Sequence, residues 1–316
     1  ITPYTGLTAG FSDQDNFFRV MPGEFLSGPL ARAWRTMNDI DALRGIADRL
    51  VALGNQFHER FAGSENADSK TPAVVDRVID FLDDNEEYFA FINLMDAHLP
   101  YHPPEEYASE FAPGVDSTAV CQNSKEYNAG VRDVDDGEWD AIRGLYDAEI
   151  RHVDAQLERL FSWMREHDEW EDTLVVVTAD HGGAFCEPHE VTGERLTVHN
   201  GGFNEVYAHV PMLVKEPGQT DGGRVDHLAS PVAFADHVRG LVDRGSTVDG
   251  GETAAPFAVE SLVGECGYES NTSMSPPGES IVVGYEQRDG ELLKYVRDRG
   301  TDQTFRVCEG LLCPTE

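Results

Sequence analysis

The chain has 316 residues, which is enough for one large α/β domain or for one large and one small domain. It carries 58 acidic and 24 basic residues, a formal net charge of −34, so its surface is expected to repel nucleic acids and anionic membranes. No apolar run approaches the roughly 20 residues needed to cross a bilayer, so no membrane span is expected.

The acidic residues occur in short runs between apolar segments, which indicates a charged coat on a folded surface. Such an excess opposes a compact state by self-repulsion, and halophilic proteins use this effect. At about 1 M salt the Debye length is only ~3 Å, so the repulsion is screened. We therefore expect a protein from a high-salt environment.

The five cysteines are scattered and odd in number, which favours free thiols in a reducing, cytoplasmic compartment. A single bridge between Cys308 and Cys313 stays open as an alternative.

The first part of the chain predicts helices and one strand. Residues 29–61 have apolar side chains at helical spacing. Thr71 and Pro72 then indicate a helix start, with threonine as the N-cap and proline at the first helical position. The apolar run over residues 88–94 (YFAFINL) predicts a buried strand, which leads into MDAHLPY.

A long polar segment over residues 103–137 is typical of a functional lid or an insertion. Apolar residues at helical intervals predict a long helix over 137–167. Residues 174–183 (LVVVTADHGG) predict a strand buried on both faces that ends in Asp-His-Gly-Gly. The alternation of helix and strand favours a mainly parallel sheet covered by helices.

The last part of the chain begins with residues 199–214 (HNGGFNEVYAHVPMLV), which predict a His-Gly loop followed by a strand. Residues 231–242 are expected to be helical, and the Gly-, Ser-, Thr- and Pro-rich stretch 245–280 to be a surface connection. Two strands, 281–285 and 292–297, are predicted around a turn at residues 288–290.

These segments, in this order, resemble the sulfatase family of the alkaline phosphatase superfamily. The resemblance rests on MDAHLPY, LYDAEIRHVDAQLERL, TLVVVTADHGG, the HNGG loop with VPMLV, and ELLKYVRD. It implies an α/β fold of alkaline-phosphatase type: a three-layer α/β/α sandwich with a mainly parallel sheet, plus a small C-terminal antiparallel sheet. Residues 1–245 would belong to the catalytic domain and residues 246–316 to the small subdomain. The resemblance starts midway through the catalytic domain, so we expect the first strands upstream of Ile1.

Asp180 and His181 are candidate metal ligands, because open α/β sheets bind ligands at the carboxyl ends of their strands. From this segment alone, a capped turn is an equally good interpretation. The resemblance implies that the pair forms half of the ligand set of one divalent cation, which we expect to be calcium, with magnesium or manganese as alternatives. Because such an ion takes six or more ligands, the resemblance implies a second half, an acidic pair on a strand upstream.

The resemblance also implies two catalytic histidines. His98 matches a histidine that contacts the transferred group or protonates the leaving oxygen, and His199 matches the histidine of the His-Gly loop. An imidazole can donate to an anionic oxygen near neutral pH. A structural turn histidine is the alternative for both. Asp96 could orient His98, although closing the turn is favoured. The other histidines considered are expected on helices or on the surface: His152, His167, His209, His227 and His237.

The chain departs from the family at the nucleophile, which lies in a Cys- or Ser-x-Pro-Ser-Arg type motif, its cysteine converted to formylglycine in true sulfatases. The stretch Cys186-Glu187-Pro188-His189-Glu190 has glutamate where the arginine is required. We therefore expect a longer parent protein with the nucleophile upstream, and an inactive fragment.

The predicted function is metal-dependent hydrolysis of a small-molecule or saccharide sulfate ester. A threonine or an unmodified serine as nucleophile would instead favour phosphorus chemistry: a phosphodiesterase, a phosphonate hydrolase or a phosphoryl transferase. A non-catalytic metal-binding scaffold is the alternative from a different class. The sequence does not indicate the substrate or the oligomeric state.

Overall fold

The structure is a computed structural model of the chain. It describes residues 10–17, 69–122, 134–188, 193, 195–198, 204–244, 256–267, 280–298, 301–308 and 311–314. The helix expected over 29–61 lies outside these ranges. In the part of the chain that is described, no helix is both long and apolar enough to cross a membrane.

The chain divides into two compact units. The first consists of residues 1–122 and 141–160, and the second of residues 123–140 and 161–316. The predicted boundary near residue 245 falls outside the described ranges and stays a prediction.

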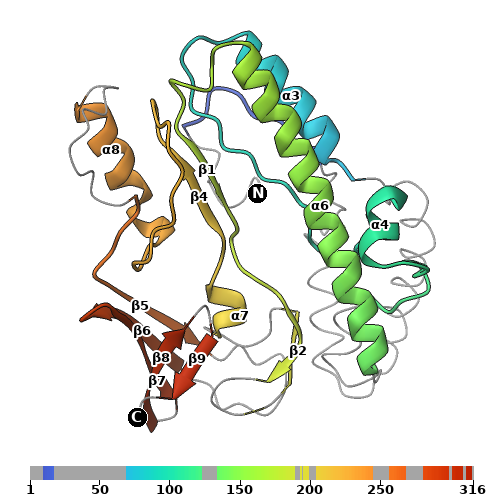
Figure 1. Cartoon of the computed structure of the whole chain (residues 1–316), viewed down its shortest axis with the longest axis vertical. Helices are drawn as coiled ribbons and strands as arrows, with labels where there is room; N and C mark the ends of the chain where they lie inside the picture. The colour runs from blue at the N-terminus through green and yellow to red at the C-terminus, as the bar shows by residue number, and fades with distance from the viewer. Residues whose placement is uncertain are drawn as a thin grey trace, which may run out of the picture. The chain divides into compact units, whose positions relative to one another are not determined.

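The first unit is built on helices α3 (Thr71–Asp83) and α4 (Glu105–Phe111). It also contains residues 141–160 of helix α6, which spans Asp136–Glu166. Helix α3 lies along α6 (Figure 1), where Arg159 donates to Asp76 at 2.6 Å and to the Pro72 carbonyl at 2.9 Å. The end of α4 packs so closely on Gly144 of α6 that a Cβ there would lie 2.5 Å from the Phe111 carbonyl oxygen. Only glycine allows this approach.

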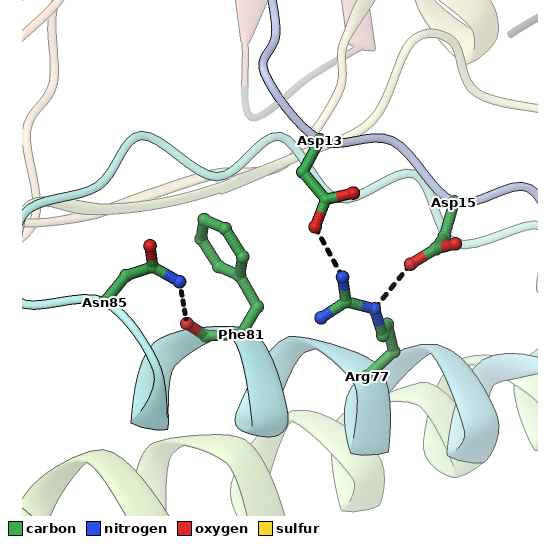
Figure 2. Close-up of polar contacts among 5 residues, drawn as sticks. All are labelled: Asp13, Asp15, Arg77, Phe81 and Asn85. Atoms are coloured by element: carbon green, nitrogen blue, oxygen red, sulfur yellow. Dashed lines mark hydrogen bonds and ion pairs between the residues drawn. The ribbon is translucent and has the colours of Figure 1, made fainter.

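Helix α3 begins at Thr71, so the threonine is its first residue and Lys70 is the N-cap. The Ser69 hydroxyl accepts from the Thr71 N–H at 3.1 Å and takes the capping role predicted for Thr71. At the other end, the Asn85 side chain donates to the Phe81 carbonyl at 2.7 Å (Figure 2).

The segment over residues 10–17 is fixed to α3 by one arginine. The Arg77 guanidinium donates to both Asp13 and Asp15, as Figure 2 shows. All three side chains are partly exposed, so each pair is worth about 0–1 kcal/mol. The contact positions the segment but adds little stability.

The prediction of a buried strand over residues 88–94 is wrong. The segment joins no β-ladder among the described strands, and the Phe89 and Phe91 side chains are 58% and 61% exposed. The Phe89 ring lies 5.7 Å from the Phe11 ring. Apolar composition favours a strand, but the ladder needs a partner backbone, which composition does not specify.

Helix α6 closely matches the helix predicted over 137–167. Its N-cap is Asp135, whose carboxylate accepts from the Glu138 N–H at 2.9 Å. The predicted apolar stripe is only partly correct, because Ile150 is 47% exposed. Residues at the predicted positions that are buried include Ile142, Leu145, Leu160 and Met164.

The second unit contains the strand that carries the Asp-His pair. Strand β1 (Val175–Thr178) pairs antiparallel with β4 (Met212–Lys215). Its residues are half-buried rather than buried on both faces, with Thr178 exposed. Every ladder among the described strands is antiparallel. The predicted parallel pairing is therefore not seen in these strands.

A hairpin of β2 (Ala184–Pro188) and β3 (Arg195–Val198) follows β1. The single-turn helix α7 (Glu205–Ala208) comes next in the chain. A small core of Ala184, Leu196 and Tyr207 joins the hairpin to α7. Cys186 in β2 forms no disulfide, and the side chains of Cys308 and Cys313 lie outside the described ones.

The C-terminal part consists of η2 (Pro231–Ala233), α8 (Phe234–Arg244) and a five-stranded antiparallel sheet (Figure 1). The two predicted strands and their turn are confirmed. The turn residues Asp289 and Gly290 both have positive φ, 53° and 81°, as a two-residue hairpin turn requires. The sheet strands in order are β5 (Ser261–Gly267), β6 (Ser280–Arg288), β7 (Glu291–Asp298), β8 (Thr301–Cys308) and β9 (Leu311–Pro314).

Candidate active site

Asp180 and His181 lie directly beyond the end of β1, as predicted. The Asp180 carboxylate accepts from the His181 N–H at 2.9 Å, and its side chain is 90% exposed. His181 Nδ1 donates to the Gly182 carbonyl at 2.7 Å. This bond fixes the tautomer that leaves Nε2 with its lone pair, the form that a metal ion binds.

These two side chains fit half of a metal site. The Asp180 Oδ1 and His181 Nε2 atoms are 3.9 Å apart, and a carboxylate with a neutral imidazole suits a divalent cation. No group of three or more candidate ligands occurs among the residues that the structure describes. The described residues thus supply a pair of donors, and a complete site needs others.

The backbone of α7 packs directly on the Asp-His loop. The Gly182 N–H donates to the Tyr207 carbonyl at 2.9 Å. A Cβ on Gly182 would lie 2.0 Å from the Val206 carbonyl oxygen, so any larger residue would displace the loop or α7. Helix α7 therefore sets the position of the residue that follows His181.

His98 lies in the first unit, on the turn that follows residues 88–95. Its N–H donates to the Met95 carbonyl at 2.8 Å, and its Nδ1 donates to the Leu99 carbonyl at 2.6 Å. The ring is exposed and, as in His181, the lone pair is on Nε2. His98 can therefore accept a proton, or donate one when it is protonated.

His199 lies outside the described residues, together with most of the His-Gly loop. The catalytic role predicted for His199 stays a prediction. Glu187, on the neighbouring hairpin, accepts a hydrogen bond from the Phe185 N–H through its carboxylate. This bond gives Glu187 a structural role in the irregular part of β2.

The loop that carries His98 is fixed at both ends by buried polar groups that the sequence analysis missed. At one end, the Ser69 hydroxyl donates to the Asp96 carboxylate and lies 3.2 Å from His152 Nε2. At the other end, the His102 N–H donates to Glu149 Oε1 at 2.8 Å. Glu149 and His152 belong to α6, so one helix supports both ends of the loop.

His152 lies on a helix, which is one of its two predicted locations, and it is only 4% exposed. One prediction is corrected by this cluster. Asp96, for which closure of its own turn was favoured, bonds instead to Ser69, 27 residues away in the chain. The sequence did contain a signal for this burial: a glutamate and a histidine lie at the same helical spacing as the apolar residues of α6.

Glu149 has an unusual electrostatic environment. Burial, and to a lesser extent the charge of Asp96, raise its pKa to about 7. Its second oxygen, Oε2, has no hydrogen-bond partner among the described residues. Burial likewise lowers the pKa of His152. Burial therefore favours the neutral form of both side chains, and Glu149 is about half protonated near pH 7.

Comparison with known proteins identifies the family. Residues 11–243 match the sulfatase family, well over half of the chain, so the chain belongs to this family. The multifunctional alkaline phosphatase superfamily protein PehA of Trinickia caryophylli is 31% identical over 86 residues, which cover 27% of this chain and 15% of that protein.

Two solved structures share the fold. The phosphonate monoester hydrolase of Agrobacterium radiobacter has a TM-score of 0.52 and 20% identity, over 75% of this chain and 54% of that one. The phosphonate monoester hydrolase of Silicibacter pomeroyi has a TM-score of 0.50 and 16% identity, over 76% and 54%. The chain has the predicted alkaline-phosphatase-like α/β fold. It spans about half the length of these two proteins, and a smaller share of PehA.

Proposed function

We propose that this chain is the catalytic portion of a metal-dependent sulfatase-like hydrolase that cleaves a sulfate ester. The observation that carries the proposal is the arrangement at the end of β1, where Asp180 and His181 present a carboxylate oxygen and an oriented Nε2 3.9 Å apart. A divalent cation, calcium by our expectation, would supply positive charge beside the transferred group.

The roles proposed for the other residues follow from their chemistry. His98 presents Nε2 from a loop that is fixed at both ends, which suits proton transfer to the leaving oxygen. His199 would contact the transferred group. Because no segment of these 316 residues fits the nucleophile motif, we place the nucleophile and the remaining metal ligands in residues outside this chain.

The first prediction concerns the metal. In the full-length protein, Asp180→Asn should weaken calcium binding by roughly tenfold or more, because an amide oxygen replaces an anionic ligand. Calorimetric titration with calcium measures this change. Asp172→Asn is the matched control, because Asp172 is exposed and its substitution removes the same charge from the same unit. Equal calcium affinities for the two variants would rule Asp180 out as a ligand.

The second prediction concerns the histidines. His98→Ala and His199→Ala in the full-length protein should each lower kcat by roughly 10²- to 10⁴-fold without unfolding the protein, because each removes a proton donor or an anion contact. His209→Ala, which replaces an exposed histidine, is the control and should leave kcat unchanged. Wild-type turnover in both test variants would remove them from the site.

A panel of aryl sulfate, phosphodiester and phosphonate monoester substrates decides the reaction. Hydrolysis of the phosphonate or the phosphodiester would favour the second candidate function, phosphorus chemistry. We consider this candidate because a phosphonate monoester hydrolase shares the fold. A full-length protein that binds calcium but hydrolyses none of these esters would favour a metal-binding scaffold.

A further inference from the structure

Lys294 is one of four lysines in the chain, and its side chain is completely buried. Its ammonium lies 2.8 Å from Glu205 Oε1, and the Glu205 side chain is only 7% exposed. The Tyr285 hydroxyl donates to the same oxygen at 2.6 Å. A buried charge is tolerated only when it is paired and hydrogen-bonded, so each member of this pair depends on the other.

The pair joins the C-terminal sheet to α7. Lys294 lies on β7 and Tyr285 on β6, whereas Glu205 is the first residue of α7. Figure 1 shows α7 close to this sheet. The pair therefore holds the N-terminal end of α7.

The opposite contact of α7 is with the Asp-His loop. The Tyr207 carbonyl accepts from the Gly182 N–H at 2.9 Å, and the Val206 carbonyl leaves no room for a Cβ on Gly182. Glu205, Val206 and Tyr207 are consecutive residues of a single helical turn, so a shift at Glu205 is transmitted to the neighbour of His181.

We propose that Lys294 and Glu205 are positioning residues for Asp180 and His181, and that they act through α7. This inference rests on the metal site proposed above. It gives the small C-terminal sheet a role in the site, because Lys294 fixes the distance between that sheet and the loop that carries the two ligands.

The test uses Lys294→Met in the full-length protein, because methionine fills a similar volume without charge. Glu205 is then buried without its cation, and α7 should shift. We expect amide hydrogen exchange in residues 180–183 to become roughly tenfold faster or more, and calcium affinity to fall by roughly 10- to 100-fold, as for other groups that orient metal ligands. The double variant Lys294→Met/Glu205→Gln removes both charges and should restore most of both properties, which a simple loss of packing would not.

Arg306→Met is the matched control. It removes a cation from the same sheet, but its ion pair with Glu291 at 3.2 Å is partly exposed. Exchange and calcium affinity should not change in this variant. If Lys294→Met does not fold, Glu205→Gln carries the test, because the lysine then faces a neutral amide, and exchange at 180–183 should still become faster.

Unchanged exchange and unchanged calcium affinity in Lys294→Met, or in Glu205→Gln where Lys294→Met does not fold, would overturn the positioning role. That result would leave the proposed function intact if the wild-type protein binds calcium. Conversely, faster exchange at 180–183 in a protein that binds no calcium would support the positioning role and overturn the metal site.

Discussion

Transfer from molar salt to about 0.01 M salt is expected to unfold the protein, or to lower its thermal midpoint by roughly 10 °C or more. The Debye length grows from ~3 Å at 1 M to ~30 Å at 0.01 M, so carboxylates across the whole surface then repel one another. With 58 acidic and 24 basic residues, carboxylates outnumber cations by more than two to one. Circular dichroism during thermal melts over a series of KCl concentrations measures the effect.

The ion pairs on the surface of the described residues do not offset this repulsion. Those of Arg77, Arg159, Arg297 and Arg288 are all at least partly exposed, and such pairs contribute about 0–1 kcal/mol each. Melts in sucrose at low salt provide the control, since sucrose strengthens burial without screening charge. A midpoint that is constant between 3 M and about 0.01 M KCl would contradict a halophilic origin of the charge.

The elements that sequence reasoning predicted well are those set by local patterns. The long helix α6 follows from apolar spacing, and the β6–β7 hairpin follows from two apolar runs around the turn at residues 288–290. The strand predicted over residues 88–94 was wrong because a strand needs a partner, and that partner can lie anywhere in the chain. The Asp180-His181 pair was found because a strand end followed by ligand-type residues is also a local pattern.

The buried polar groups were missed because their burial is decided by distant segments. Glu149 lies four residues after Leu145 and seven after Ile142, so it shares their face of α6, but a charge in this position is normally taken as the edge of a solvated face. Lys294 similarly alternates in phase with Val296, which is buried. The signal available in both cases was a charged residue in register with an apolar pattern.

The protonation of Glu149 is expected to make stability depend on pH in a defined window. Its pKa is raised to about 7 in the folded protein, against the ordinary value of 4.5. Between these two pH values the folded state keeps a proton that the unfolded chain loses, so the Glu149 contribution to stability falls as pH rises from 4.5 and levels off above about 7. The total loss is on the order of a few kcal/mol, at about 1.4 kcal/mol per pKa unit.

Glu149→Gln isolates this contribution. Glutamine cannot ionise, and its side-chain carbonyl can still accept from the His102 N–H, as Glu149 Oε1 does at 2.8 Å. We expect the variant and the wild type to have similar free energies of unfolding at pH 4.5, and the variant to be more stable by roughly 2–3 kcal/mol at pH 8. Urea unfolding in molar salt at several pH values measures the difference.

The contribution of His152, whose lowered pKa acts in the opposite direction below pH 6.5, is common to both proteins and cancels. Glu158→Gln, on an exposed position of the same helix, should show no such pH-dependent difference. A gain for Glu149→Gln that is the same at every pH would mean that Glu149 is ionised in the folded state and that its burial is compensated by charge or solvent.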